Sequence, residues 1–329
     1  MKRRQFITLL GGAVAAWPVV TRGQQQSIPI IGFLGSSSSD PSAHGPFADA
    51  LREGLNGAGL AEGRHYVVEA RWAHGDFDRL PALASELVNA GVTILATIGG
   101  DVAALAAKRA TSKIPIVFVS GSDPVRSGLV QSLNRPGANI TGVTVITSEI
   151  FAKRLELLRD MVPGTAVVGI LVNRKNPNAE GEMKDIEVVA QRLNQRTAVA
   201  NASSSAEFEP AIAELVARGA TALLIHPDAF FTGYRQQLVS AVARHRLPAI
   251  YHFKEFVTSG GLVSYGADFP GAFRIAGAYI ARILKGESPG NLPVQQPNKF
   301  ELVINLKTAR DIGVTVPPTL IARADEVIE

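Results

Sequence analysis

Six short polar segments of this sequence carry residue types that could hold a small polar molecule. Each follows an apolar run, and together they supply serine hydroxyls, side-chain amides, a few carboxylates, and glycines that leave backbone N–H groups accessible. The segments are 35–40, 97–101, 120–124, 173–178, 226–228 and 264–268. Several precede a predicted helix, whose N-terminus attracts anionic groups such as a carboxylate. This chemistry favours the binding of a small polar solute.

The candidate ligand contacts in these segments are small or polar residues: Ser36, Ser37, Gly99, Gly100, Ser120, Ser122, Asp123, Asn173, Asn176, Asp228, Tyr265 and Asp268. Taken singly, each Ser, Asp or Asn could equally be an ordinary helix cap or turn residue. Asp123 and Asp228 suit two roles, an acid–base pair across a cleft or carboxylates that hold a substrate ammonium group. The sequence does not separate these two roles.

Known catalytic and metal-binding signatures are absent from the sequence. It contains no G-x-G-x-x-G spacing, no Walker phosphate loop and no G-x-S-x-G elbow. Its six histidines are scattered, without an H-E-x-x-H pair. His226 and His252 lie near predicted strand ends, where they could contact a ligand, cap a helix or lie on the surface. We expect no catalytic residues, no metal site and no cofactor.

The first 23 residues differ from the rest of the chain. A basic head at residues 2–4 is followed by an apolar run over residues 6–20 and by small residues that end at Gly23. This order is typical of a secretory signal, and the run is short for a membrane-spanning helix. The alternatives are a membrane anchor or a buried helix. The paired arginines also match a twin-arginine leader. We therefore expect 1–23 to be a cleaved twin-arginine signal peptide and the protein to be periplasmic.

The net charge and the absence of cysteine exclude several kinds of partner and of covalent modification. The chain has a net charge of +4, but four cations and no acids lie in residues 1–23, so the remainder carries no net charge. Nucleic-acid binding needs a surplus of Lys and Arg on one face, and we therefore expect no nucleic-acid partner. The sequence contains no cysteine, which excludes disulfides, thiolate metal sites and an N-terminal lipid-modified cysteine.

The elements that must position the polar segments alternate along the chain. Short β-branched runs predict strands at 28–34, 66–70, 92–98, 114–119, 140–146, 166–172, 197–200, 222–225, 249–251, 261–265 and 301–305. Apolar residues at helical spacing predict helices at 47–55, 80–88, 101–110, 151–161, 179–194, 206–217, 231–245 and 269–284. Ligands bind at the carboxyl ends of such parallel strands, which is where the polar segments lie.

This alternation of strands and helices predicts the α/β fold class, with two doubly wound parallel-sheet lobes divided near residue 145. Repeated βα units favour parallel pairing, with helices on both faces of each sheet. One long open sheet is the alternative, but single cores seldom grow beyond about 250–300 residues. The proline-rich stretch 289–297 is predicted to connect the lobes.

Many segments in the same order give the chain a family likeness. They are 31–35, 71–73, 115–119, 122–124, 134–137, 140–143, 153–158, 171–173, 176–178, 260–266, 283–286 and 299–309. Through them the sequence resembles the ABC-transporter substrate-binding proteins of the tryptophan/tyrosine-binding type, over nearly its whole length. The resemblance implies a type I periplasmic-binding fold, in which two lobes joined by a hinge close on a small-molecule solute and present it to an inner-membrane ABC permease. We expect a monomer.

The resemblance also implies an interleaved chain. Residues 28–145 would form the N-terminal lobe with a returning segment at about 265–290. Residues 146–264 would form the C-terminal lobe with a returning segment at about 298–329. The sequence departs from the aromatic-amino-acid binders at two loops, where Gly99-Gly100 follows Ile98 and Ala229 follows Asp228. The solute therefore stays open between an amino acid, an aromatic acid and another small carboxylate. The alternative functions are a ligand-binding module that feeds a sensor and a periplasmic enzyme.

Overall fold

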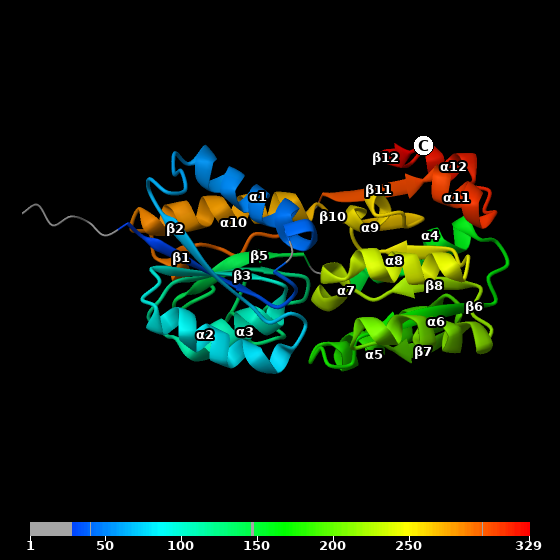
Figure 1. Cartoon of the computed structure of the whole chain (residues 1–329), viewed down its shortest axis with the longest axis horizontal. Coiled ribbons are helices and arrows are strands. Elements are labelled where there is room, and N and C mark those ends of the chain that lie inside the picture. Colours follow the sequence, from blue (N-terminus) through cyan, green and yellow to red (C-terminus); the bar gives the residue numbers. More distant parts are fainter. Residues whose placement is uncertain (1–27, 40, 146–147, 298) are drawn as a thin grey trace, which may run out of the picture.

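The computed structural model describes residues 28–39, 41–145, 148–297 and 299–329, and these form two α/β lobes (Figure 1). The predicted signal peptide lies outside the described residues. The N-terminal lobe contains a five-stranded sheet in the order β2 (Val67–Trp72), β1 (Ile30–Gly35), β3 (Ile94–Ile98), β4 (Ile116–Ser120) and β5 (Ile140–Thr144). All of its pairings are parallel. The predicted fold class, two doubly wound lobes, is confirmed.

Helices cover both faces of this sheet because its strands are apolar on both sides. Helices α1 (Pro41–Gly57) and α10 (Phe269–Leu284) lie on one face, and α2 (Leu80–Asn89) and α3 (Asp101–Ala110) lie on the other, with η1 (Phe77–Arg79) before α2. Although α1 and α10 are more than 200 residues apart in sequence, they are closely packed. A Cβ atom on Gly54 would lie 2.0 Å from the Arg274 carbonyl oxygen, so glycine is what permits this approach.

The C-terminal lobe contains a seven-stranded sheet. Its order is β12 (Glu326–Ile328), β11 (Phe300–Asn305), β10 (Val263–Ala267), β9 (Ala249–Tyr251), β8 (Ala222–Ile225), β6 (Val167–Val172) and β7 (Arg196–Asn201). One face carries α4 (Ser148–Met161), α5 (Ala179–Arg192), α11 (Leu306–Ile312) and α12 (Pro318–Ile321). The other carries α6 (Phe208–Ala217), α8 (Arg235–Arg244) and α9 (Lys254–Thr258), with η2 (Ser205–Glu207) before α6.

One strand pairing differs from the parallel arrangement that the repeated βα units predict. Strand β11 is antiparallel to β10, with Ala267 opposite Phe300 and Val263 opposite Ile304. After β10 the chain leaves for α10 in the N-terminal lobe, and it re-enters the C-terminal lobe at the same edge. A strand that starts at this edge must run away from it, so β11 runs against its neighbour. The sequence pattern did not predict β12 or the short helices α9, α11 and α12.

The proline-rich stretch 289–297 is mostly part of the N-terminal lobe, which corrects its prediction as a simple connection between lobes. It begins with η3 (Pro289–Asn291), and Val294 is buried in that lobe. The Gln295 carbonyl accepts from the Thr144 N–H at 2.9 Å, and the Gln295 N–H donates to the Gly142 carbonyl at 3.0 Å. These bonds occupy the free edge of β5, which would otherwise expose unpaired backbone groups.

The predicted helix over 231–245 is divided in two. The short helix α7 (Ala229–Gly233) is followed by α8, and Tyr234 at the junction has φ −111° and ψ 24°, outside the helical region. Because of this break, α7 points its N-terminus at the space between the lobes while α8 packs on the sheet. Through this break α7 brings Ala229 and Thr232 to the cavity, while its Phe230 and Phe231 stay in the core with α8.

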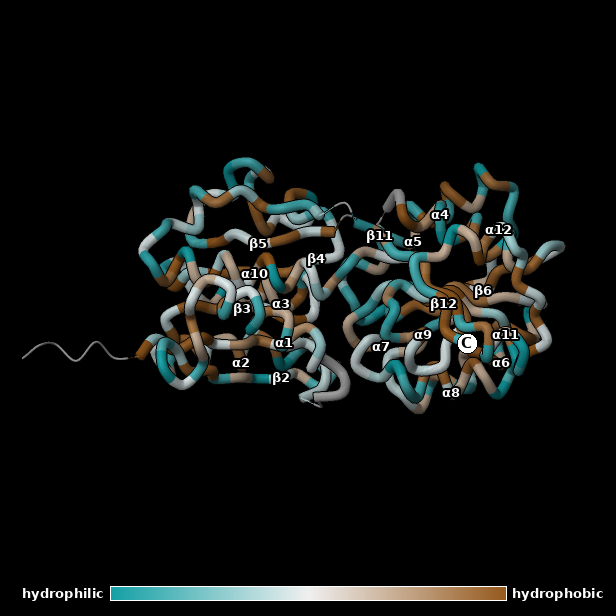
Figure 2. The backbone as a smooth tube through the Cα atoms, turned by 90° about the horizontal axis from the view of Figure 1, so that it is seen from above, coloured by the Kyte–Doolittle hydropathy of each residue, from teal (hydrophilic) through white to brown (hydrophobic). Residues whose placement is uncertain are grey.

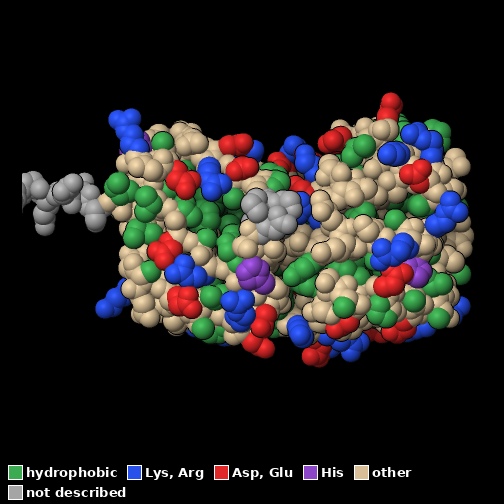
Figure 3. All heavy atoms as spheres, viewed as in Figure 1, with side chains coloured by type: hydrophobic (Ala, Val, Ile, Leu, Met, Phe, Trp, Pro, Cys, Tyr) green, Lys and Arg blue, Asp and Glu red, His purple; other side chains and the backbone are tan. Residues whose placement is uncertain are grey.

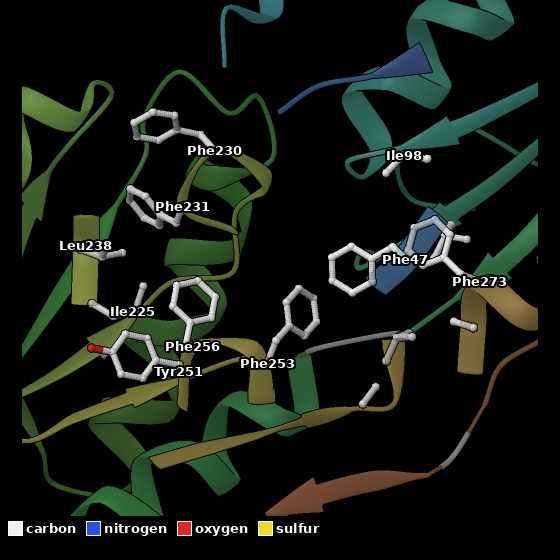
Figure 4. Close-up of a cluster of buried hydrophobic side chains, with 14 of the residues drawn as sticks. Phe47, Ile98, Ile225, Phe230, Phe231, Leu238, Tyr251, Phe253, Phe256 and Phe273 are labelled. Carbon is white, nitrogen blue, oxygen red and sulfur yellow. The ribbon is translucent and has the colours of Figure 1, made fainter. Parts of the chain in front are cut away.

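The cores of the two lobes are continuous across the interface on one side. A single cluster of buried apolar side chains runs from α1 and α10 through Phe253 to α8 and α9. Figure 4 shows Phe47 and Phe273 on one side of this junction and Phe253 on the other. Figure 2 shows brown, hydrophobic stretches in the interior of both lobes and teal segments toward the outside.

Among the described residues, no helix combines the length and the apolar character needed to cross a bilayer. On the face drawn in Figure 3, acidic and basic side chains are interspersed.

Candidate functional site

A cavity lies between the two lobes, and both lobes line it. Its space is about 770 Å³, part of it open to solvent. The N-terminal lobe contributes Ser37, Phe47, Ile98, Gly99, Gly100, Asp101, Val119, Gly121, Ser122, Phe269 and Phe273. The C-terminal lobe contributes Asn176, Glu182, Pro227, Asp228, Ala229, Thr232, His252 and Phe253.

The backbone at Gly99 and Gly100 shapes the N-terminal wall of the cavity. Gly99 has φ +112° and Gly100 φ +81°, which L side chains rarely adopt. A Cβ atom on Gly99 would lie 2.0 Å from Ser36 Oγ. Its absence lets the Ser36 hydroxyl pack against the loop and donate to the Gly99 carbonyl at 2.7 Å. Ser36 therefore supports the loop from behind, and Ser37 lines the cavity.

Asp101 is a buried carboxylate on the same wall. It is the first residue of α3, after Gly100 at the N-cap. The Ser120 hydroxyl donates to one carboxylate oxygen, and Asn178 Nδ2 lies 3.4 Å from the other. Burial raises the pKa of Asp101, although the serine hydrogen bonds counteract part of this shift. Ser120 thus orients Asp101 from within the lobe.

Asp228 is the corresponding carboxylate on the C-terminal wall. Its Oδ1 accepts from Asn173 Nδ2 at 3.1 Å and from the Phe230 N–H at 2.8 Å, and its Oδ2 accepts from Asn176 Nδ2 at 2.8 Å. The Phe230 bond caps α7. Burial raises the pKa of Asp228, and the two asparagine hydrogen bonds oppose this effect. The two asparagines fix the orientation of this carboxylate at the cavity surface.

A buried histidine extends this network. Thr232 donates its hydroxyl proton to the Asp228 carbonyl at 2.9 Å, and Thr232 Oγ1 lies 3.1 Å from His252 Nε2. Because the hydroxyl proton is used, we assign the His252 proton to Nε2, which donates to Thr232. Burial lowers the pKa of His252 well below its ordinary value, so the ring is neutral. It supplies a polar but uncharged patch to the cavity.

A cluster of phenylalanine rings, called the aromatic wall below, also lines the cavity. Phe47 stacks on Phe273 with ring centroids 5.3 Å apart, and Phe253 packs edge-on against Phe269 at 4.0 Å. Phe47 and Phe253, from opposite lobes, lie 6.1 Å apart. Figure 4 shows the two rings approaching each other across the junction. The cavity lining therefore combines carboxylates and an amide with aromatic rings from both lobes.

Polar contacts also join the lobes around the cavity. Ser122 Oγ donates to Glu182 Oε1 at 3.2 Å, and Asn178 Nδ2 donates to Ser122 Oγ at 3.2 Å. Arg126 forms an ion pair with Asp185 at 2.9 Å. These contacts connect the loop after β4 in the N-terminal lobe to α5 in the C-terminal lobe. The two lobes therefore touch beside the cavity.

The structure brings together several residues that the sequence predicts. Ser37, Gly99, Gly100, Ser122, Asn176 and Asp228 line the cavity. Ser36, Ser120 and Asn173 are buried directly behind it, where they hold lining residues. Asp123 lines a neighbouring cavity, with its Oδ1 accepting from the backbone N–H groups of Val125 and Arg126.

Two predicted residues lie outside the cavity. Tyr265 stacks on Phe300, because β10 is followed by an edge pairing with β11 rather than by an open loop. Asp268 accepts from the Gly271 N–H at 2.8 Å and caps α10. The polar segment 264–268 thus follows a strand that turns into the other lobe, and its side chains serve the fold there.

The aromatic wall and the lining residues Asp101, Glu182 and Thr232 were not among the predicted site residues, whereas His252 was named as a residue that could contact a ligand. Phe47 and Phe273 follow the apolar spacing of their helices, so they resemble ordinary core residues. Glu182 stands in the first turn of α5, where an acidic residue is expected for helix stability alone. Because α5 directly follows the polar segment 173–178, its first turn could have been expected to lie at the site, and this would have indicated Glu182. Among the described residues, no group of three or more potential ligands could hold a metal ion.

The family of this chain follows from its similarity to known proteins. The family model described as "ABC transporter substrate binding protein" matches residues 28–328. The chain belongs to the ABC transporter substrate-binding proteins. This confirms the family resemblance and the prediction that the chain is the solute-binding component of such a system.

Individual relatives agree with the family. The "Tyrosine-binding protein" of Clostridioides difficile (strain R20291) is 28% identical over 292 residues, which are 88% of this chain and 82% of that protein. A conserved domain protein from Vibrio cholerae has a TM-score of 0.84 at 26% identity, with 92% of this chain and 100% of that chain covered. A domain from Streptococcus pneumonia in complex with L-Trp has a TM-score of 0.81 at 24% identity over 92% of this chain and 100% of that chain, which shows the shared fold.

Proposed function

We propose that this substrate-binding protein takes up one small solute between its lobes in the periplasm and delivers it to an inner-membrane ABC permease. The observation that carries the proposal is the cavity lined from both lobes, with Asp228 on one wall and the Phe47–Phe253 pair across the junction. A solute that touches both walls stabilises the closed arrangement over the open one, because only the closed form makes both sets of contacts.

The moving units in this proposal are the two interleaved lobes. Residues 28–145 with the segment 268–297 move against residues 148–267 with the segment 299–329, which shifts the predicted return at about 265–290 because residues 265–267 belong to β10 and Gln295 pairs with β5. The chain changes lobe between β5 and α4, between β10 and α10, and between η3 and β11. Strand ends and short connections of this kind are where hinge motion concentrates. We propose that the exported protein is monomeric and performs no chemistry on its solute.

The cavity favours a solute with a flat apolar body and a polar end. Aromatic side chains bind a ring through its face or edge. Asp101 and Asp228 offer buried carboxylates, and Asn176, Ser37 and Ser122 add neutral hydrogen-bonding groups. The relative from C. difficile is described as binding tyrosine, which supports an aromatic amino acid or another small aromatic acid for this chain. The different residues at Gly99-Gly100 and at Ala229 leave room for a different member of that class.

A thermal-shift screen tests this proposal. The purified chain without residues 1–23 is heated with single amino acids, aromatic acids and other small carboxylates. A solute that is present at 100 times its dissociation constant adds about 2.7 kcal/mol to the free energy of unfolding, which raises the midpoint by several degrees. We expect a shift with at least one aromatic acid or amino acid. A flat response over the whole set would contradict solute binding.

A further inference from the structure

A second cavity, whose space of about 600 Å³ is partly open to solvent, adjoins the first and shares Ser122, Glu182 and Pro227 with it. It lies between the loop after β4 on the N-terminal lobe and helices α4 and α5 on the C-terminal lobe. The two cavities are therefore adjacent at the interface, and the Ser122–Glu182 hydrogen bond of 3.2 Å lies in the wall that they share. A solute held in the first could extend a group into the second.

Most charged side chains that line the second cavity already have partners. Arg126 pairs with Asp185 at 2.9 Å, and Glu182 pairs with His226 Nε2 at 3.0 Å. The Asp123 carboxylate accepts from two backbone N–H groups at 2.9 and 3.2 Å. These acidic groups are satisfied by the protein itself.

Arg154 is the exception among the charged side chains that line this cavity. Its residue is 2% exposed, and its Nε donates to the Tyr265 carbonyl at 2.6 Å. Its Nη1 is buried without a hydrogen-bond partner, and no described residue forms an ion pair with it. Burial lowers the pKa of Arg154 to about 9, which leaves the guanidinium charged at neutral pH. A buried charge without a counter-charge is costly, so a bound anion would relieve this cost.

We propose that the second cavity is the subsite for a carboxylate of the bound solute, with Arg154 as its counter-charge. The planar guanidinium presents N–H groups at the spacing of carboxylate oxygens, and it already has one edge fixed by Tyr265. The apolar body of the solute then occupies the first cavity, between the aromatic rings and Asp228. This inference rests on the proposed function and assigns the solute to the acids rather than to neutral or cationic compounds.

A single carboxylate fits this subsite better than a more highly charged group. Asp123, Glu182 and Asp185 all line the same cavity, and they would repel a phosphate dianion. Only one guanidinium there lacks an acidic partner among the described side chains. One negative charge balances it.

Matched acid and amide probes test the subsite by titration calorimetry. The pairs are L-tyrosine and L-tyrosinamide, L-tryptophan and L-tryptophanamide, benzoate and benzamide, and phenylacetate and phenylacetamide. For each pair that binds, we expect the acid to bind the wild-type protein about 30-fold more tightly or better, since leaving a buried charge unpaired has a large cost. Arg154→Met should abolish this preference.

Two further variants keep the test decisive. Arg154→Lys retains the charge but not the fork, so it should keep part of the preference for the acid even if Arg154→Met fails to fold. Lys153→Met removes a cation from the exposed face of the same helix, where Lys153 pairs with Glu156, and should leave the preference unchanged.

The outcomes separate this inference from the proposed function. Equal binding of acid and amide by the wild-type protein, or an unchanged preference in Arg154→Met, overturns the carboxylate subsite. So does a neutral or cationic solute that emerges from the thermal-shift screen as the only class to bind. In each of these cases the solute-binding function stands. Binding by no compound at all contradicts both proposals.

Discussion

Asp228→Ala is expected to weaken solute binding about 100-fold or more, because truncating one member of a buried, charged hydrogen-bond network costs about 2–5 kcal/mol. The change removes a carboxylate from the cavity wall and leaves the Asn173 and Asn176 amides and the Phe230 N–H without their acceptor. Asn176 lines the cavity, so its orientation is lost as well. The dissociation constant from titration calorimetry with the screened solute measures the effect.

Asp123→Ala is the matched control for this variant. Asp123 also follows a strand and also caps backbone N–H groups, but it lies in the neighbouring cavity and its Oδ1 is occupied by those caps. Asp123 also lines the proposed carboxylate subsite, where its charge would repel that of the solute, so we expect its removal to cost no affinity. An equal loss in both variants, or none in Asp228→Ala, would show that the first cavity is not the solute site.

Asp228→Asn separates charge from shape through its pH dependence. The folded-state pKa of Asp228 is raised above 3.8, so the native state holds this proton more tightly than the unfolded state does. The contribution of Asp228 to stability is therefore full at pH below 3.8 and is lost as pH rises through the folded-state pKa. The free energy of unfolding of Asp228→Asn minus that of the wild type should therefore be larger at pH 7 than at pH 4. Thermal unfolding at the two pH values measures the difference.

Phe253→Ala is expected to weaken solute binding by about 10- to 100-fold, from roughly 1.5–3 kcal/mol of lost apolar burial. Phe253 belongs to the C-terminal lobe, but its ring packs on Phe47 and Phe269 of the N-terminal lobe. Its removal takes away a surface for the solute and an apolar contact that forms only when the lobes meet. The affinity loss should therefore accompany a more open average structure.

Phe256→Ala provides the comparison for Phe253→Ala. Phe256 is fully buried inside the C-terminal lobe, where it stacks on Tyr251 at 4.9 Å. It packs behind His252, also at 4.9 Å, and does not itself line the cavity. We expect about 3–5 kcal/mol of lost stability, as for a buried aromatic ring, and an unchanged affinity in the folded fraction. If both variants lose stability but keep their affinity for the solute, the aromatic wall belongs to the hydrophobic core and does not contact the solute.

Much of this fold can be predicted from the sequence because its strands are buried on both faces. The apolar run at 28–34 has no polar alternation, and β1 is indeed buried along almost its whole length. The reversal at β11 could not be predicted the same way. Its apolar residues are compatible with either direction, and only the passage of the chain through the other lobe determines it.

The polar half of the site could also be predicted, whereas the apolar half could not. Ser37, Gly99 and Asp228 stand in loops after strands, where the geometry of parallel sheets gathers side chains at one edge. Phe47 and Phe253 are buried like core residues, and only the meeting of two lobes makes them a wall. Arg154 lies in a predicted helix next to other charged residues, such as Lys153 and Glu156, which are expected on an exposed face. Its burial depends on the neighbouring strand β10, which the local sequence does not encode.

The most direct test of solute capture between the lobes is small-angle X-ray scattering of the chain without residues 1–23, with and without the solute found in the thermal-shift screen. At saturation we predict a smaller radius of gyration for the wild-type protein. The same solute concentration should leave the radius of Asp228→Ala nearly unchanged. A wild-type radius that stays constant when calorimetry shows full occupancy would contradict closure of the lobes on the solute.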